Sequence, residues 1–175
     1  MPWKNKNTKP RKDGFRFLKA AVMIMNNIKL AIACDHGGYE LKQEILAYLD
    51  KEGIAYEDFG CDSTASVNYP VYASKVCKAI QSGDCTRGIL VCGTGIGMSM
   101  AANKHRGIRA ACCSDTFSAR MTRMHNDANV LCLGGRVVGA GLALDMVKLF
   151  IETEFEGGGR HTERVAMLAE IENEQ

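Results

Sequence analysis

The chain has 175 residues, the length of one globular domain, and its 46% hydrophobic and 24% charged residues exclude a disordered, collagen-like or coiled-coil protein. Seven of its 22 lysines and arginines lie in residues 1–19 beside one acidic residue, which leaves 15 basic and 19 acidic residues in 20–175. The remainder is therefore slightly acidic and offers no broad basic surface, so we expect no nucleic-acid partner.

Residues 1–27 combine this basic stretch with a short apolar run, residues 18–25, that Lys19 interrupts. A signal peptide or organelle presequence has the same order, but no small-residue cleavage site follows and residues 26–29 lead directly into a strand. No stretch reaches the 18 or so apolar residues of a membrane span, so we expect no membrane partner. We predict a basic, disordered N-terminal extension over 1–27 and one domain over 28–175.

Strand and helix patterns alternate after residue 28. Short continuous apolar runs indicate buried strands, and apolar residues at helical spacing indicate helices. The predicted strands are 29–34, 54–59, 88–92, 109–113 and 130–133. The predicted helices are 39–52, 70–82, one from the 93–97 loop to 104, one from a cap at 114 or 115 to 124, 139–154 and 162–172.

Five strands, each followed by a helix, imply a parallel sheet with helices on both faces. The continuous apolar strands agree, because parallel strands are buried on both sides. We therefore predict a three-layer αβα sandwich with a five-stranded parallel sheet, of the Rossmann or flavodoxin-like kind. The last helix lies beyond this pattern, and we expect it to pack on a partner subunit.

Ligands of such sheets bind beyond the carboxyl ends of the strands. The strand 88–92 ends in a Gly-Thr-Gly-Ile-Gly loop over residues 93–97. Glycines at alternate positions between a strand and a helix let backbone N–H groups converge on an anion. The loop is not a P-loop, and Met98 stands where a dinucleotide fingerprint has its third small residue. A turn without ligand and a nucleotide site stay open from the residues alone.

Four side chains near strand ends are candidates for acid–base chemistry. Cys92 precedes the glycine loop, where backbone N–H groups favour a thiolate, although a structural core cysteine has the same position. Asp35 follows the first strand, where it faces the ligand crevice or caps the next helix. His125 and His36 each have a polar neighbour in sequence, but a lone histidine is often structural.

Three arginines are candidates for binding a phosphate dianion. Arg136 follows a Gly-Gly pair, and Arg160 and Arg164 are one helical turn apart. Guanidinium groups match phosphate oxygens in geometry and charge. Surface ion pairs are the alternative for each of them.

The eight cysteines lie singly or as the adjacent Cys112 and Cys113, several of them inside apolar runs. Without a Cys-x-x-Cys motif or a matching histidine pair they predict neither zinc nor another metal. We expect reduced thiols that pack as small hydrophobic side chains in a cytoplasmic protein.

Several segments together closely resemble type-B ribose-5-phosphate isomerase, from about residue 29 to residue 172. They are 29–39, 68–73, 88–99, 101–104, 107–110, 125–130, 134–139 and 158–161. The resemblance implies an aldose–ketose isomerase of the non-oxidative pentose phosphate pathway, which interconverts ribose 5-phosphate and ribulose 5-phosphate through a cis-enediolate. Isomerases of allose 6-phosphate and galactose 6-phosphate share the scaffold and are the alternative.

The resemblance also implies roles for the candidate residues. Cys92 is expected to move the proton between C1 and C2, and His125 to open the furanose with help from Asp35. One branch of the family has a glutamate base where this chain has Met98, so the cysteine variant applies. The expected oxyanion donors are the Thr94 side chain and the amides of Gly93, Gly95, Ile96 and Gly97. The expected phosphate ligands are His36, Arg136, Arg160 and Arg164, and the expected sugar contacts are Tyr69 and Asn126.

Thiolate, imidazole and backbone dipoles supply base, acid and oxyanion site, so we expect no cofactor. His125 precedes its strand and Cys92 ends one, which places them at opposite edges of the sheet. The resemblance likewise implies a homodimer with shared active sites, possibly a dimer of dimers, and we predict that His125, Asn126 and Arg136 enter from the partner subunit. A dinucleotide-dependent enzyme and a non-catalytic sugar-phosphate-binding protein are the rival interpretations.

Overall fold

The computed structural model describes residues 28–174, so the predicted disordered extension over 1–27 lies outside the described residues. Five parallel strands form one sheet: β1 (Lys29–Cys34), β2 (Ala55–Asp58), β3 (Arg87–Cys92), β4 (Ala110–Cys112) and β5 (Val130–Gly134). The helices are α2 (Tyr39–Glu52), α3 (Tyr69–Gln81), α4 (Ile96–Ala102), α5 (Thr116–Asn126), α6 (Ala140–Glu152) and α7 (Arg160–Asn173). Each predicted strand and helix is present, with its ends within two residues of the expected ones.

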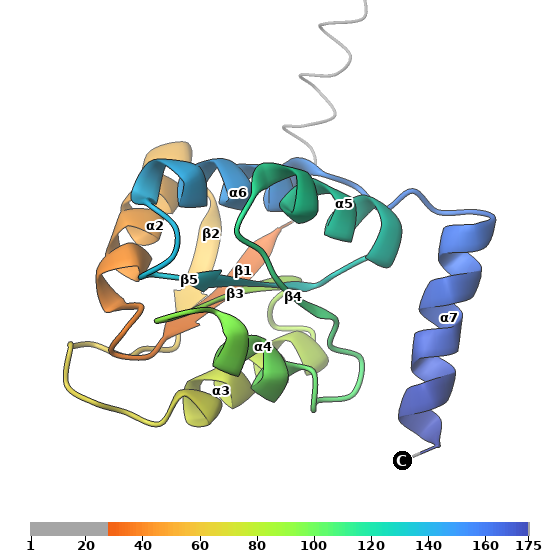
Figure 1. The fold of residues 1–175 in the computed structure, drawn as a ribbon, viewed down its shortest axis with the longest axis horizontal. Helices are drawn as coiled ribbons and strands as arrows, with labels where there is room; N and C mark the ends of the chain where they lie inside the picture. Colours follow the sequence, from red (N-terminus) through yellow and green to blue (C-terminus); the bar gives the residue numbers. More distant parts are fainter. Residues whose placement is uncertain (1–27, 175) are drawn as a thin grey trace, which may run out of the picture.

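The predicted three-layer sandwich is confirmed. Helices α2, α5 and α6 cover one face of the sheet, and α3 and α4 cover the other (Figure 1). The strand order is β2-β1-β3-β5-β4. In the flavodoxin order the fifth strand lies at the edge of the sheet and the fourth lies next to the third. Here the last two strands are exchanged, so that β5 lies between β3 and β4. This exchange places the ends of β1, β3 and β5 next to one another at the edge where the strands end, which we call the carboxyl edge.

Side chains of the central strands alternate between two cores. Ile89 and Val91 of β3 pack toward α2, α5 and α6, whereas Leu90 and Cys92 pack toward α3 and α4. The pleat reverses the direction of successive side chains, so both faces of a buried strand are apolar. The Cys92 side chain therefore lies on the side of α3 and α4, beneath the loop that joins β3 to α4.

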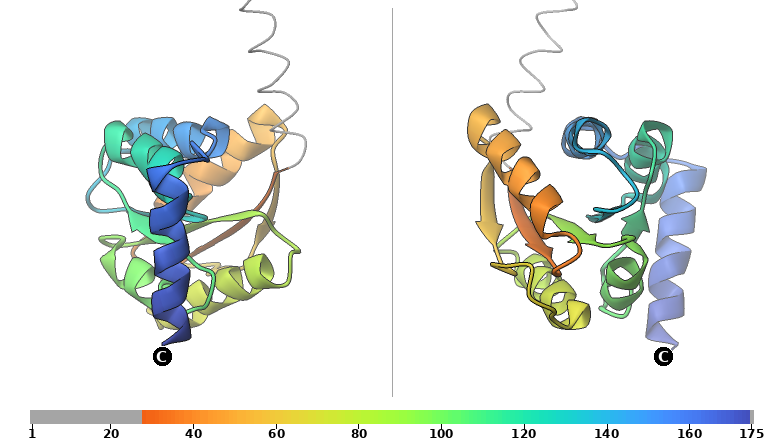
Figure 2. Two further views of the ribbon diagram at one scale, coloured as in Figure 1. Left: turned by 90° about the vertical axis from the view of Figure 1, so that its right-hand side faces the viewer. Right: turned by 60° about the vertical axis from the view of Figure 1, so that its left-hand side comes forward.

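Helix α7 stands apart from the sandwich (Figures 1 and 2). It contacts α5, and near its end the Glu172 carboxylate accepts from the Gly107 N–H at 3.0 Å, in the loop between α4 and β4. Its Met167, Leu168 and Ile171 side chains are exposed. Across residues 28–174, no helix is both long and apolar enough to cross a membrane.

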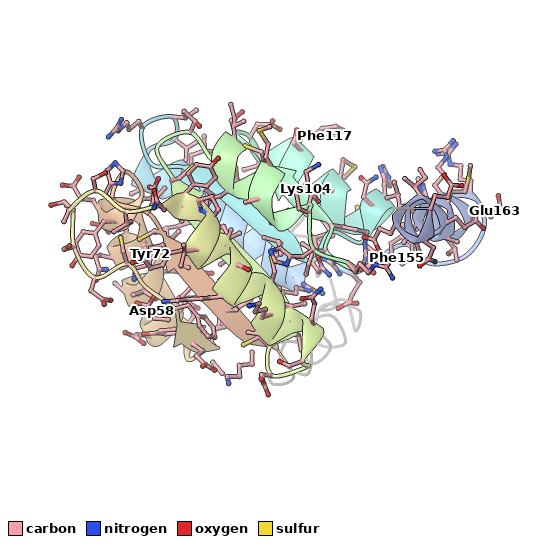
Figure 3. All side chains as sticks on the ribbon, turned by 90° about the horizontal axis from the view of Figure 1, so that it is seen from below. Asp58, Tyr72, Lys104, Phe117, Phe155 and Glu163 are labelled. Atoms are coloured by element: carbon pink, nitrogen blue, oxygen red, sulfur yellow. The ribbon has the colours of Figure 1, made fainter. Side chains whose placement is uncertain are left out.

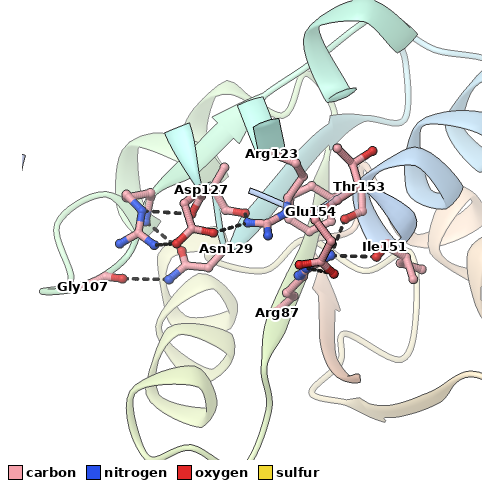
Figure 4. A network of polar contacts seen from close by, with 11 residues as sticks. Arg87, Gly107, Arg123, Asp127, Asn129, Ile151, Thr153 and Glu154 are labelled. Carbon is pink, nitrogen blue, oxygen red and sulfur yellow. Dashed lines mark hydrogen bonds and ion pairs between the residues drawn. The ribbon is translucent and has the colours of Figure 1, made fainter. Parts of the chain in front are cut away.

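The opposite, amino edge of the sheet holds a buried arginine at the start of β3. The Arg87 guanidinium donates to the carbonyl oxygens of Phe150 and Ile151, at 2.7 and 2.8 Å, in the last turn of α6 (Figure 4). Burial, with Arg123 nearby, lowers the pKa of Arg87 to about 10, so the side chain stays charged at neutral pH. A cation at the carboxyl end of a helix is favoured by the helix dipole and satisfies carbonyls that no helical N–H can reach.

A second buried arginine joins α5 to the same region. Arg123 donates to Asp127 Oδ1 at 2.8 Å, to the Ala128 carbonyl at 2.6 Å and to the Thr153 carbonyl at 3.3 Å. The other carboxylate oxygen of Asp127 accepts from Arg109 Nη2 at 2.8 Å. The network of Figure 4 thus ties the ends of α5 and α6 to the start of the sheet.

Replacing Arg123 by methionine is expected to cost about 3 kcal/mol of unfolding free energy, because two buried carbonyls lose a charged donor. Arg120→Met, on an exposed position of the same helix, is the matched control and is expected to change it by less than about 0.5 kcal/mol. Urea unfolding followed by circular dichroism measures both. Equal effects of the two substitutions would show that the network adds nothing to stability.

Candidate active site

Three loops meet at the carboxyl edge, after β1, β3 and β5. The Gly135 N–H donates to the Cys92 carbonyl at 2.8 Å, and the Arg136 N–H donates to the Gly93 carbonyl at 3.0 Å. A Cβ at Gly135 would stand 2.8 Å from the Gly37 carbonyl oxygen, so only glycine allows the loops after β1 and β5 to come this close. The site is therefore assembled from backbone in contact with backbone.

Cys92, the last residue of β3, lies under the glycine loop (residues 93–97). The residue is 5% exposed, and its Sγ accepts a hydrogen bond from the Gly95 N–H at 3.1 Å. Gly95 has a φ of 78°, in the left-handed region that favours glycine. A Cβ there would stand 2.9 Å from Cys112 Sγ and 3.0 Å from the Leu133 carbonyl carbon. The loop thus directs an N–H donor at the sulfur only while residue 95 is glycine.

The other side chains of the 93–97 region face solvent. Thr94 is exposed, and its Oγ1 accepts from the Ile96 N–H at 3.4 Å. The Tyr69 ring, at the start of α3, stands over Gly97, 3.0 Å from where a Cβ would be. A hydroxyl and a phenol therefore border the loop that covers Cys92.

Asp35 orders the loop after β1. Its Oδ1 accepts from the N–H groups of Gly37, at 2.8 Å, and Gly38, at 3.1 Å, just before α2 begins. The carboxylate is 8% exposed. Asp35 therefore accepts from amides next to the start of the helix, as a capping residue does. It also lies at the carboxyl edge beside the glycine loop, where ligands of such sheets bind.

His36 and Arg136 line one cavity of about 210 Å³ with Gly37, Thr64 and Gly135. His36 Nδ1 accepts from the Val67 N–H at 3.3 Å, so Nε2 is the nitrogen that carries the proton. The Arg136 side chain lies over Gly93, with Cδ 3.6 Å from where a Cβ would stand. Two groups that can bind an anion, the His36 ring and the Arg136 guanidinium, therefore border this space together with Glu40, at the same edge of the sheet as Cys92.

The prediction that Arg136 reaches the Cys92 site from the partner subunit is wrong. Arg136 was expected to enter from the partner subunit together with His125, but it lies beside Gly93 of its own chain. The reason is register: Cys92 pairs with Gly134 in the parallel sheet, so the residue two positions after Gly134 comes out at the same edge as the glycine loop. Its place directly after a predicted strand was a signal for this position.

The remaining candidates gather at the amino edge. His125 and Asn126 end α5, and Arg160 and Arg164 lie on α7 with exposed side chains. The five residues of β5 span about 15 Å, so this group is separated from Cys92 by the length of the strand. In one chain the predicted site residues form two groups at opposite edges of the sheet.

The amino-edge group includes a histidine to which the sequence drew little attention. The rings of His125 and His161 stack with centroids 4.4 Å apart and an interplanar angle of 4°. His161, the second residue of α7, is buried. Its position in the 158–161 motif, next to Arg160, was the available signal.

The eight cysteines are unpaired, and seven of them are buried, as expected for thiols that pack as apolar side chains. Burial raises the pKa of Cys77 to about 12 and that of Cys113 to about 11, which keeps both protonated. Cys112 is the exposed exception and donates to the Thr94 carbonyl at 3.7 Å.

Comparisons with known proteins show which family this chain resembles. The profile of the family described as Ribose/Galactose Isomerase matches residues 30–168. Ribose-5-phosphate isomerase B of Escherichia coli is 48% identical over 144 residues, 82% of this chain and 96% of that protein. D-erythrulose-4-phosphate isomerase of Pectobacterium atrosepticum is 44% identical over 133 residues, 75% and 88% of the two chains. The structure of ribose-5-phosphate isomerase B from Clostridium thermocellum matches with a TM-score of 0.82 and 53% identity, over 84% of this chain and 99% of that one.

The glycine loop itself can be tested by stability. Gly95→Ala is expected to lower the unfolding free energy by about 3 kcal/mol, because strain at positive φ adds to a backbone overlap. Gly83→Ala is the matched control: its φ of 84° is equally unfavourable, but a Cβ there meets nothing within 4 Å, so about 1 kcal/mol is expected. Denaturant unfolding of both variants gives the difference, and equal losses would mean that the loop has room to move.

Proposed function

The chain belongs to the ribose/galactose isomerase family, and from this premise we propose that it interconverts ribose 5-phosphate and ribulose 5-phosphate by proton transfer at Cys92. It is an isomerase of phosphorylated sugars, not a non-catalytic binding protein. One observation carries the proposed chemistry: Cys92 Sγ accepts a hydrogen bond from the Gly95 N–H beneath the glycine loop, at the same edge of the sheet as the cavity that His36 and Arg136 line.

The reaction moves one proton between neighbouring carbons. The Cys92 thiolate takes the proton from C2 of the open-chain aldose, and the electron pair passes to O1 to form a cis-enediolate. The same proton returns from sulfur to C1, while the hydroxyl proton passes from O2 to O1, which leaves the ketose. A hydrogen-bond donor aimed at the sulfur stabilises the negative charge on it between turnovers.

We assign stabilisation of the enediolate to the glycine loop. The proposed donors are the amides of Gly93, Gly95, Ile96 and Gly97 and the Thr94 hydroxyl. Fixed donors near a developing oxyanion lower the barrier because they need no reorganisation during the reaction. We assign Asp35 and Tyr69 to the sugar hydroxyls at the same edge, because both border the loop.

Ring opening and part of the phosphate site require a second subunit. We assign His125 as the acid that protonates the ring oxygen, Asn126 to the sugar, and Arg160 and Arg164 to the phosphate. These residues lie a strand length away from Cys92 of their own chain. His36 and Arg136 bind the phosphate from the Cys92 side.

Two exposed apolar groups support a homodimer in which the amino edge of one chain meets the carboxyl edge of the other. The first group consists of exposed apolar residues that lie near the carboxyl edge in the chain order, Ile96, Met100, Phe117 and Val137. Phe117 is 72% exposed and lies at the periphery of the molecule in Figure 3. Met167, Leu168 and Ile171 form the second group, on α7. Large exposed apolar side chains of this kind mark subunit interfaces. A dimer of dimers is the larger assembly consistent with them.

The cysteines and the family description support a proposal for the compartment and for a second candidate substrate. Eight unpaired thiols suit a reducing compartment, so we place the enzyme in the cytoplasm. The family description includes galactose isomerases, which makes a 6-phosphate sugar such as allose or galactose 6-phosphate the second candidate substrate. We expect neither metal nor organic cofactor to be required.

Replacing Cys92 by alanine is expected to lower kcat for ribose 5-phosphate by about 10³-fold, the usual contribution of a positioned acid–base group. Cys85→Ala, a buried cysteine just before the other end of β3, is the matched control and should keep kcat within about twofold. The assay compares turnover of ribose 5-phosphate, allose 6-phosphate and galactose 6-phosphate by the wild type. Faster turnover of a 6-phosphate would reassign the substrate, and an active Cys92→Ala enzyme would reject the base.

Shared sites predict complementation between two inactive chains. A dimer of a Cys92→Ala chain and a His125→Ala chain contains one intact site. In that site, Cys92 comes from the His125→Ala chain and His125 comes from the Cys92→Ala chain. Random reassociation of equal amounts is expected to restore about one quarter of wild-type activity, since about half of the dimers are mixed and each has one working site. The separately tagged chains are refolded together and assayed. No recovery, with mixed dimers demonstrated by the tags, would place both residues in one subunit's site.

A further inference from the structure

We propose that His161 is a positioning residue for ring opening: its imidazole, stacked flat against that of His125, fixes the plane in which His125 presents its proton to the sugar. This inference rests on the proposed function, because it needs His125 to be the ring-opening acid. It adds a residue whose side chain acts through His125 without touching the substrate.

The stack is built where α7 meets the body of the molecule. His125 lies in the last turn of α5, and His161 is the second residue of α7. The Glu156 N–H donates to the Met124 carbonyl at 2.9 Å, which ties the segment before α7 to that same turn. Thr162 Oγ1 accepts from the Gly158 N–H at 2.8 Å and shapes the glycine turn between them. Both ends of the approach are therefore fixed by hydrogen bonds, and the rings face each other as a consequence.

A histidine at a helix end needs such support to act as an acid. The second side-chain torsion of histidine is broad, so an imidazole without partners rotates freely. Within residues 28–174, the contact that orients the His125 ring is the stack, with centroids 4.4 Å apart and planes 4° from parallel. A parallel neighbour at this distance blocks rotation about the torsion but leaves the ring edge open. The stack therefore holds the His125 ring in one plane.

The charges around the pair favour a neutral His161. Burial lowers the pKa of His161 below 6.5, and His125, Arg160 and Arg164 act in the same direction, while Glu156 opposes them. A neutral ring can lie against a cation, whereas two imidazolium rings at this distance would repel. A neutral His161 therefore leaves the stack free of charge repulsion when His125 holds the proton that it is proposed to give to the sugar.

The same residues do not make a metal site while the stack stands. Ligand atoms of His125, Glu156 and His161 lie within 4.8 Å of one another. A histidine nitrogen binds a metal along a lone pair in the ring plane, and two stacked parallel planes cannot meet at one ion. The cationic Arg160 and Arg164 next to His161 also oppose a metal ion. The arrangement fits orientation of an imidazole, not chelation.

The test compares His161→Ala with His161→Phe, which keeps a flat ring and removes both nitrogens. Two quantities are measured on each purified full chain: kcat for ribose 5-phosphate, and the Kd of a four-carbon phosphorylated hydroxamate, which mimics the enediolate and cannot form a ring. For His161→Ala we expect kcat to fall about 10-fold, because the acid is misplaced, with the hydroxamate Kd within about twofold of the wild type. For His161→Phe we expect kcat within about threefold of the wild type. Glu163→Ala, an exposed neighbour on α7, is the control and should change neither quantity.

Three results would overturn the proposal. Wild-type kcat in His161→Ala would show that the ring is not needed. A His161→Phe enzyme as slow as His161→Ala would show that stacking is not what matters. Loss of hydroxamate binding in His161→Ala would show a merely structural role. An inactive wild type in the same assay would instead refute the proposed substrate, so the two failures are distinguishable.

Discussion

The close approach of the backbones at the carboxyl edge is the constraint on which the rest of the structure depends. Because β5 pairs with β3, the Gly135 N–H reaches the Cys92 carbonyl and the Arg136 N–H reaches the Gly93 carbonyl. These bonds leave no space for a Cβ at Gly135. The register of the sheet thereby sets the distances between the Cys92 sulfur, the amides of the glycine loop and the Arg136 guanidinium. The arrangement of these groups at the carboxyl edge therefore follows from strand pairing.

Much of this was predictable from the sequence because parallel strands are buried on both faces. Their continuous apolar runs identified all five strands, and the residues after them, Asp35, His36 and the glycine loop, came out at one edge as ligand-binding loops do. The side on which Arg136 lies was misjudged, although it follows a strand, because it was grouped with His125 by the resemblance. The exchange of β4 and β5 was not predictable, since either order buries the same side chains.

The buried charges escaped prediction for a different reason. Lys42 is 1% exposed in α2 and donates to Asp58 Oδ2 at 2.7 Å and to the Cys61 carbonyl at 2.9 Å, and Arg87 and Arg123 are similarly enclosed. In a sequence such residues look like solvated positions on a helix or strand end. Their partners are mostly carbonyls and carboxylates far along the chain. Only the tertiary structure shows that they satisfy polar groups at helix and strand ends, where apolar side chains could not.

Dividing the site between two edges of the sheet has a consequence for where the catalytic groups can lie. The proposed base and the proposed acid act on different atoms of the sugar, so they do not have to be neighbours in one chain. Here the proposed base ends β3 and the proposed acid ends α5, a strand length apart in each chain. In the proposed homodimer they meet around a substrate held between two subunits. The amino edge then has to hold its imidazole in a fixed plane without help from the other half of the site, and among the described residues the parallel ring of His161 is the contact that can do so.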